Sequence, residues 1–510
     1  MDDLFDFLLA RQSGGGGGFA PPVAPKDALL FYSLKEIGIS IANTRKNWNG
    51  TLYYSTDYAS WTEWDGTTEI VSVLYNGWHR IFLRGVSNTL ITGSTGSGFV
   101  IRGSSVECKG NCNNLLDYTT SPKLGSGCFY GLFKNCTSLT SAPELPATGL
   151  ARKCYGQMFS GCTAFTTAPE LPATELADSC YAGMFSHCTS LTSAPELPAT
   201  KLMEECYEQM FSSCSSLASA PELPATELAQ ECYAYMFGRC TSLVSAPELP
   251  ATELAEGCYG SMFATCTSLA SAPELPVTEL AKRCYAGMFA GCTSLTTAPE
   301  LPATELTEEC YEGMFNGCTS LTSAPELPAT GLARKCYGQM FSGCTAFTTA
   351  PELPATKLME ECYEQMFSSC SSLVSAPELP ATELAKGCYA GMFAGCTSLT
   401  TAPELPATEL AQSCYRGMFE GCTSLVSVPA LPAMELAEGC YFGMFEGCSN
   451  IMLSETQGGE YQNEYRVPIS GEGVSASYAL SGMFSNTGGS FTGTPAINTT
   501  YYTSNTVINP

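Results

Sequence analysis

The feature that most constrains this chain is a 26-residue repeat that recurs thirteen times, close to C-Y-x-x-M-F-x-x-C-T-S-L-T-S-A-P-E-L-P-A-T-E-L-A-x-x. The first cysteines of these units run from Cys128 to Cys440 at one constant period, without an insertion. Self-similarity at a fixed period of this length is typical of a solenoid, in which each unit buries its apolar side only against its neighbours. We therefore expect most of the chain to form one long displayed surface.

Within one unit, the apolar residues fall at i, i+1, i+4, i+5 and i+8, which predicts one stripe on a two-turn helix. In the second repeat these residues are Cys154, Tyr155, Met158, Phe159 and Cys162. The alternation over 163–167 predicts a short strand that ends before Pro169. Stacked strands advance about 4.8 Å per unit whereas packed helices need about 8–10 Å, so the stack should curve. The predicted fold class is an α+β repeat protein, a curved solenoid of 13 units of 26 residues.

The composition disfavours several classes of partner. The formal net charge is -26, from 49 acidic and 23 basic residues, so we expect neither nucleic acid nor an anionic membrane surface as a partner. No apolar run approaches the roughly 20 residues that span a bilayer, so we expect no membrane insertion. The start, Met1 to Leu4, carries acid where a secretory signal carries base, so we expect no secretion signal.

The 28 cysteines suggest disulfides, but their placement favours free thiols. Twenty-six belong to the repeat, as pairs eight residues apart, and eight residues of helix would separate them by about 12 Å, too far for a bridge. Bridges between neighbouring units remain geometrically possible. We expect small buried apolar groups stacked in two columns. Cys108 and Cys112 resemble half of a metal site, but no second pair or histidine follows nearby, so we expect no zinc.

Catalytic chemistry has little support in the sequence. The two histidines, His79 and His187, have no partner pattern for nucleophilic catalysis. The glycine run Gly14 to Gly18 follows no strand and opens no helix, so it does not predict a phosphate loop. We therefore expect no enzyme, no catalytic residue, no cofactor and no metal.

The chain before the repeats has two parts. We expect residues 1–25 to form a short amphipathic helix, followed by a glycine tether and a proline-rich segment. One face of the helix is apolar, and its residues lack an internal partner. We expect this face, formed by Leu4, Phe5, Leu8 and Leu9, to dock on the surface of a partner, the alternative being a frayed terminus. Residues 26–120 predict a small β domain, with a hairpin at Asn76-Gly77 between strands over 70–75 and 78–84. The repeats then occupy 121–450, and residues 451–510 predict a capping region, because a solenoid needs atypical units at its ends.

Positions on the outer side of the predicted helices vary between units and are the candidate binding residues. Exposed Tyr, Phe and Arg side chains can anchor an interface. The candidates are Gln157, His187, Glu208, Gln209, Tyr235, Arg239, Arg416 and Phe442. The glutamate of Pro-Glu-Leu also recurs in eleven consecutive units, from Glu144 to Glu404. This row predicts a solvated acidic edge, with bridging by divalent cations as the alternative.

The F-x-x-C-T-S-L-T-S segment, with a proline after it, resembles the BspA-like leucine-rich repeats of bacterial surface proteins. The segments Tyr54 to Asp57, Trp61 to Glu63 and Cys108 to Cys112 resemble the β module that precedes such repeats in proteins of gut anaerobes and their phages. The commonest unit of that family is shorter than this one. The resemblance implies a curved leucine-rich-repeat solenoid that binds cells or extracellular proteins and catalyses no reaction.

Three functions fit these observations. The leading hypothesis is a virion adhesin, a phage fibre or receptor-binding protein, which joins a virion structural protein through residues 1–12 and meets a host surface protein or glycan through the repeats. It would be assembled in the host cytoplasm and reside in the virion. The alternatives are a bacterial cell-surface adhesin and a cytoplasmic protein-interaction scaffold. A homo-oligomer stays open.

Overall fold

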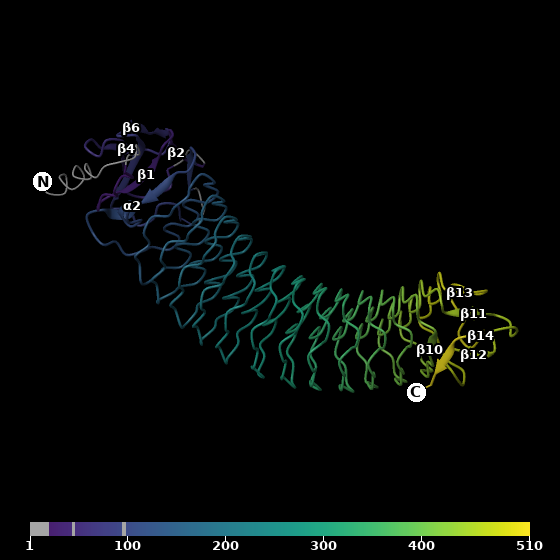
Figure 1. Ribbon diagram of the computed structural model, residues 1–510. Helices are drawn as coiled ribbons and strands as arrows, with labels where there is room; N and C mark the ends of the chain where they lie inside the picture. The colour runs from purple at the N-terminus through teal and green to yellow at the C-terminus, as the bar shows by residue number, and fades with distance from the viewer. Residues whose placement is uncertain (1–19, 43–45, 94–97, 510) are drawn as a thin grey trace. The chain divides into compact units, whose positions relative to one another are not determined.

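The computed structural model describes residues 20–42, 46–93 and 98–509 (Figure 1). The chain forms two compact units, Met1–Ala225 and Thr226–Pro510. The elements of the first unit are β1 (Leu29–Ser33), β2 (Gly38–Ile41), β3 (Thr51–Ser55), β4 (Thr62–Trp64), β5 (Ile70–Val71), β6 (Val73–Tyr75), β7 (Trp78–Val86), β8 (Phe99–Arg102), β9 (Glu107–Lys109) and α2 (Asn114–Asp117). Those of the second unit are β10 (Ser427–Pro429), β11 (Met452–Ser454), β12 (Asn463–Arg466), β13 (Gly488–Gly489), β14 (Thr500–Thr503) and β15 (Thr506–Ile508).

The first unit opens with two β-sheets. One has the order β4-β3-β7-β1-β9, with β6 also paired to β7, and the other has the order β5-β2-β8. The ring centroids of Trp64 in β4 and Phe99 in β8 lie 5.9 Å apart, which joins the sheets through an apolar contact. Trp48 stacks on Trp64 at 5.4 Å and extends this aromatic cluster.

The hairpin predicted at Asn76-Gly77 is confirmed. Tyr75 of β6 pairs with Trp78 of β7, and the two turn residues have φ angles of 47° and 79°, as this two-residue turn requires. The prediction of one strand over 70–75 is wrong, because Ser72 forms hydrogen bonds with Ile37 and interrupts the strand. The N–H of Ile37 donates to Ser72 Oγ at 2.9 Å, and the N–H of Ser72 donates to the carbonyl of Ile37. The segment is therefore split into β5 and β6, which lie in different sheets.

The stretch predicted as a helix in each repeat is a run of tight turns instead. In the second repeat, the N–H of Met158 donates to the carbonyl of Tyr155 at 3.1 Å, within the same turn. The N–H of the next residue, Phe159, donates to Met184 of the following repeat at 2.9 Å. An α-helix would direct both groups to the residue four places back. Along this stretch every second backbone N–H group therefore bonds to the next repeat.

The α+β part of the predicted fold class is therefore wrong for the repeats. Within the described ranges the helix is confined to α2, and the repeats consist of turns and short extended segments. The physical cause is a left-handed residue at every fourth position, such as Lys153, Gln157 and Gly161 with φ of 57°, 52° and 76°. A helix needs φ near −63° throughout. The count of thirteen units and the curvature of the solenoid stay predictions.

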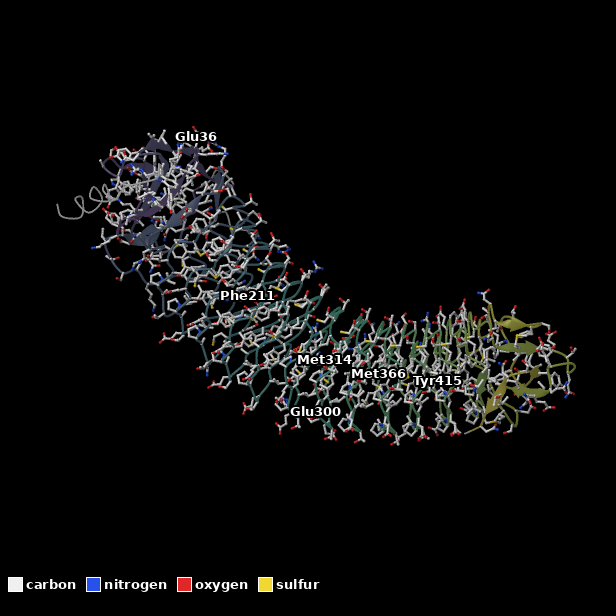
Figure 2. All side chains as sticks on the ribbon, in the orientation of Figure 1. Glu36, Phe211, Glu300, Met314, Met366 and Tyr415 are labelled. Carbon is white, nitrogen blue, oxygen red and sulfur yellow. The ribbon has the colours of Figure 1, made fainter. Side chains whose placement is uncertain are left out.

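The repeat core consists of columns of identical side chains. In the second unit the tyrosine rings stack from Tyr233 to Tyr441, with neighbouring centroids 5.7–6.0 Å apart. The first unit contains a phenylalanine column from Phe133 to Phe211 with spacings of 5.5–5.7 Å. Figure 2 shows Tyr415 inside the ribbon and Glu300 at its outer edge. Each repeat thus supplies one ring to each contact along these columns, and a single repeat has no closed core of its own.

The predicted strands shrink to single paired residues in most repeats. Thr167 pairs with Ser193 in parallel, and Ser245 pairs with Ser271 in the same way. Prolines close behind, such as Pro169, lack the N–H that would extend the ladder. Among the repeats that the structure describes, a longer pairing forms between β10 and β15, where the repeat sequence departs from its consensus.

The expected free thiols are confirmed, since all 28 cysteines are free and buried. The second cysteine of a repeat also donates a hydrogen bond to the preceding repeat. Cys266 Sγ lies 3.0 Å from the carbonyl oxygen of Phe237, which accepts the N–H of Cys240 as well. The thiol therefore occupies the second acceptor direction of a buried carbonyl, a role that an aliphatic side chain of the same size cannot fill.

Different structures adjoin the first and last repeats. In the first unit, the N–H of Phe99 donates to Leu132 and that of Val106 to Ser138, so residues 98–112 stack on the first repeat. In the second unit, Phe445 stacks on Phe484 at 5.4 Å, and Tyr465 packs edge-on against Phe484 at 5.9 Å. Tyr465 belongs to the sheet β12-β14-β11-β13. Among the described residues, no helix has the length and apolar character to cross a membrane.

Candidate functional site

The eight candidate binding residues occupy three positions of the repeat. Two of these positions are left-handed, and many other repeats place glycine there. Gln157, Gln209 and Tyr235 share the second left-handed position, His187 and Arg239 the third, while Glu208, Arg416 and Phe442 follow the core tyrosine. Since the left-handed residues donate their N–H to the next repeat, as Tyr235 does to Gly260 at 2.9 Å, their side chains are free of the backbone ladder.

Most candidate side chains reach solvent. His187, Gln209, Tyr235, Arg239 and Arg416 are exposed, Tyr235 to 50%. The other three, Gln157, Glu208 and Phe442, are half-buried.

The structure brings some candidates together in pairs. The guanidinium of Arg416 lies 5.3 Å from the ring centroid of Phe442, one repeat away, within the range of a cation–π contact. In the first unit, Gln209 Nε2 donates to Glu208 Oε1 at 2.9 Å. A contact that restricts an exposed side chain lowers the entropy cost of binding a partner. That they do bind one stays a prediction.

The buried thiols are poorly suited to nucleophilic chemistry. Burial raises the pKa of the Cys188 thiol to about 12, so it stays protonated at neutral pH. His187 Nδ1 lies 2.9 Å from the hydroxyl of Ser186, its neighbour in sequence, and His79 Nδ1 lies 3.1 Å from Ser72 Oγ. Within the described part of the chain, no group of three or more His, Cys, Asp or Glu residues could hold a metal ion.

The Pro-Glu-Leu glutamates are exposed in each of the eleven repeats that contain them, from Glu144 through Glu274 to Glu404. They lie after the extended segment, away from the turn positions that hold the candidate residues. Their exposure agrees with a solvated acidic edge, and bridging by divalent cations stays untested.

A second charged feature, which sequence reasoning missed, lies in the two residues before the first cysteine of each repeat. Within the second unit, six successive pairs from Glu256 to Lys386 alternate in sign, and we call these six rows the charge stripe. Its rows are Glu256, Lys282 with Arg283, Glu308 with Glu309, Arg334 with Lys335, Glu360 with Glu361, and Lys386. The sequence signal was present, since the charge at the x positions that close the repeat changes sign from one repeat to the next between Glu256 and Lys386.

Ion pairs connect the rows of the charge stripe. Arg334 lies 2.9 Å from Glu308 and 3.0 Å from Glu309, and Lys282 lies 3.0 Å from Glu308. The hydrogen bonds from Lys282 and Arg334 hold the pKa of Glu308 below its ordinary value. Because these side chains are partly exposed, each pair adds little to the free energy of unfolding.

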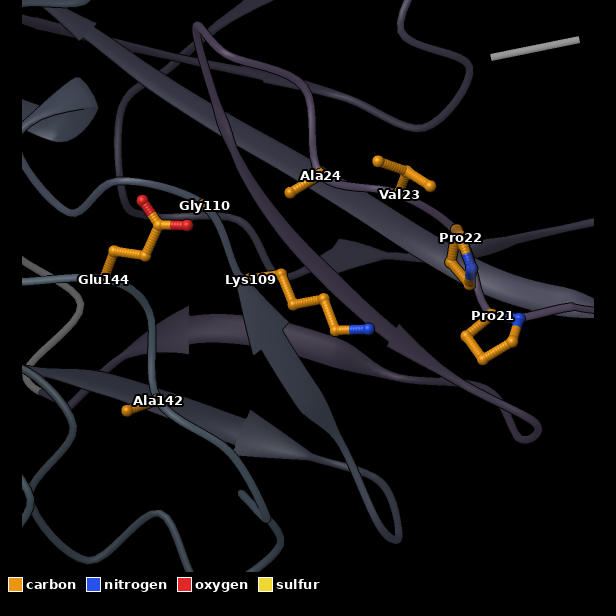
Figure 3. A pocket seen from close by; sticks show the side chains of 8 residues that line it. All are labelled: Pro21, Pro22, Val23, Ala24, Lys109, Gly110, Ala142 and Glu144. Carbon is orange, nitrogen blue, oxygen red and sulfur yellow. The ribbon is translucent and has the colours of Figure 1, made fainter. Parts of the chain in front are cut away.

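A hollow of about 520 Å³ lies in the first unit, between the β domain and the first repeat (Figure 3). It is lined by Pro21, Pro22, Val23, Ala24, Lys109, Gly110, Ala142 and Glu144. Figure 3 shows Lys109 between Glu144 and the two prolines. The ammonium of Lys109 lies 4.8 Å from the ring centroid of Tyr32 and 3.8 Å from a carboxylate oxygen of Glu107. A single lysine already paired with Glu107 and Tyr32, beside small apolar groups, does not indicate a catalytic site.

The predicted docking residues Leu4, Phe5, Leu8 and Leu9 lie outside the described residues. Their role stays a prediction.

The family model of the BspA type leucine-rich repeat region, in six copies, matches residues 123–270, 233–374, 282–426 and 325–452. These overlapping matches cover residues 123–452, more than half of the chain. No curated protein matches the chain.

Proposed function

Since this chain belongs to the BspA-type leucine-rich repeat family, we propose that it is a non-enzymatic adhesin of a phage virion. The family is generally one of binding and scaffold proteins. In our proposal the N-terminal segment anchors the chain to a virion structural protein, and the repeats present a binding surface to a protein or glycan of the host.

The observation that carries this proposal is the contrast between the inside and the outside of the repeats. The tyrosine, methionine, phenylalanine and cysteine columns are buried and nearly identical from repeat to repeat. The turn positions outside them carry glycine, serine, tyrosine, arginine or glutamate. A uniform core with a varied exterior allows one backbone to present many side-chain combinations, which suits recognition.

Binding to the host is tested with the labelled full chain on candidate bacterial cells. The double variant Tyr235→Ala/Arg239→Ala removes two exposed side chains from one repeat and should weaken binding at least tenfold. The matched control Glu248→Ala removes an exposed side chain from the opposite part of the same repeat and should bind as the unmodified chain does. Equal binding by all three proteins would remove these turn positions from the proposed surface.

Anchoring is tested by deleting residues 1–12. We expect the shortened chain to keep its fold and its binding to cells but to be lost from purified particles. Normal incorporation would place the anchor elsewhere, and particles that never contain the full chain would favour the alternative of a bacterial cell-surface adhesin.

A further inference from the structure

The rows of the charge stripe form one continuous ladder. The N–H of Arg283 donates to Glu308 at 3.1 Å, that of Glu309 to Arg334 at 3.0 Å, and that of Lys335 to Glu360 at 3.1 Å. The same bond joins Gly257 to Lys282 and Glu361 to Lys386. Because these backbone hydrogen bonds fix the distance between rows, the charged residues keep a constant spacing along the stripe. Six rows therefore display the signs − + − + − + at the pitch of the repeat.

The charged side chains remain accessible although they are paired within the chain. The exposed fractions are 42% for Lys282, 41% for Arg334 and 53% for Lys386. Arg334 has five N–H donors, and its short contacts to Glu308 and Glu309 both use Nη1. Its distances to Glu360 and Glu361 are 3.9 and 3.7 Å, too long for strong hydrogen bonds. The stripe therefore keeps donors for a further partner.

We propose that the charge stripe is a contact surface for a second copy of this chain, which lies antiparallel across it. A twofold axis between the rows of Glu308 and Arg334 places these two rows opposite each other. The same axis places Lys282 opposite Glu360, and Glu256 opposite Lys386. All six facing rows then have opposite signs, so the stripe is complementary to itself.

The other registers are less favourable. A parallel copy in register, or an axis through any row, places like charges face to face. Moving the axis to the next gap, between Arg334 and Glu360, sets Glu256 against Glu438 and Lys282 against the neutral Gln412. One register is therefore preferred.

A second copy is the partner favoured by spacing as well as by sign. The distance between rows is set by the repeat, with neighbouring tyrosine rings 5.9–6.0 Å apart beneath the stripe. Another copy carries the same spacing, so the match holds along the whole stripe. Two residues by six rows cover on the order of 300 Å² per copy, below the roughly 800 Å² per partner of a stable interface. The contact is therefore weak and sensitive to salt.

The test uses the full chain and two variants in sedimentation velocity. Variant one, Arg334→Glu/Lys335→Glu, makes three neighbouring rows acidic. Variant two, Glu308→Arg/Glu309→Lys, makes three neighbouring rows basic. In a mixture, each altered row of one variant faces a row of opposite sign in the other, although both variants keep a negative net charge. The matched control, Glu300→Arg/Glu326→Lys, makes the same charge change as variant two at the exposed Pro-Glu-Leu positions.

We expect the unmodified chain to self-associate in about 50 mM salt and to do so at least tenfold more weakly in about 500 mM salt, because screening shortens the reach of surface charges. Each variant alone should associate at least tenfold more weakly, the mixture should recover association, and the control should behave as the unmodified chain does. Circular dichroism checks that the variants are folded. An unmodified chain that stays monomeric in low salt, folded variants that do not recover on mixing, or a control as weak as variant two would each overturn the proposal.

Discussion

Replacing Phe289 with alanine tests whether the phenylalanine column holds the repeats together. The ring is fully buried, and its centroid lies 5.7 Å from those of Phe263 and Phe315, with interplanar angles of 4° and 9°. Truncation removes a buried aromatic ring and leaves a cavity between two repeats, which costs about 3–5 kcal/mol in the free energy of unfolding. Phe289→Leu keeps most of the volume and should cost less than about 1.5 kcal/mol.

The assay must be local, because each repeat contacts only its neighbours. Hydrogen exchange followed by mass spectrometry reports the opening of separate peptides. The expected loss corresponds to a roughly 100- to 4,000-fold faster exchange in peptides around residues 258–318. Peptides near the chain end, around residues 440–485, should change much less. Glu300→Ala is the control, since Glu300 is exposed in the same repeat and should shift stability by less than about 0.5 kcal/mol.

Two results would refute this reasoning. A cost below about 1 kcal/mol for Phe289→Ala would mean that the stacked ring contributes little packing, against the usual cost of core truncation. Equal acceleration in every peptide would mean that the second unit opens all at once, so the repeats would not be coupled only to their neighbours.

Three further predictions follow from the repeat backbone and its charges. A thiol reagent should find almost no reactive cysteine in the native chain but nearly all 28 in denaturant without reductant, and a count below half would contradict free thiols. Gly343→Ala should cost about 1–2 kcal/mol in urea unfolding, because Gly343 has a φ of 75°, while Gln365→Gly at a φ of 53° should be neutral or stabilising. The pKa of Glu308 is lowered in the folded chain, so its ionised form adds stability above its ordinary pKa of 4.5, and this is lost as pH falls through the lowered value. Arg334→Gln should therefore reduce the loss of stability on acidification, measured by urea unfolding at neutral and acidic pH, and an unchanged loss would mean that Arg334 does not set this pKa.

The burial of the repeat core could be predicted from the sequence, because identity of residue type and constant spacing are enough to place side chains in columns. Met158 and Phe159 were expected inside on this ground, and both are fully buried. The hairpin at Asn76-Gly77 was predictable because few residues adopt positive φ at two successive positions. These inferences depend on local chemistry that the rest of the fold does not override.

The backbone path of the repeats was not predictable from apolar spacing alone. Residues at i, i+4 and i+8 point the same way on a helix, but they also do so on successive four-residue turns. The residue that distinguishes the two structures is the left-handed one that recurs every four positions beside the apolar residues. Gly417 and Gly421 stand four residues apart in one repeat, both with positive φ, and glycine is among the poorest helix formers. This signal outweighs the apolar stripe when the period between glycines is also four.

The candidate site was predicted in part, because outward positions can be inferred from variability but their backbone conformation cannot. Tyr235 and Arg239 were chosen as variable residues, and both are exposed. The charge stripe was missed because its pattern appears only when equivalent positions of successive repeats are compared, as with Glu308 and Arg334.

The left-handed positions connect the surface to the stability of the fold. A residue other than glycine costs about 1–2 kcal/mol there, so glycine is the favoured residue wherever the side chain contributes nothing. Arg283, Glu309 and Lys335 occupy the first left-handed position within the charge stripe, and Tyr235 and Arg239 occupy the second and third. Since the backbone ladder forms equally well with glycine, as the bond from Gly257 to Lys282 shows, these side chains are not needed for stacking. Contacts outside the core, between side chains or with partners, are what must offset the strain of keeping them.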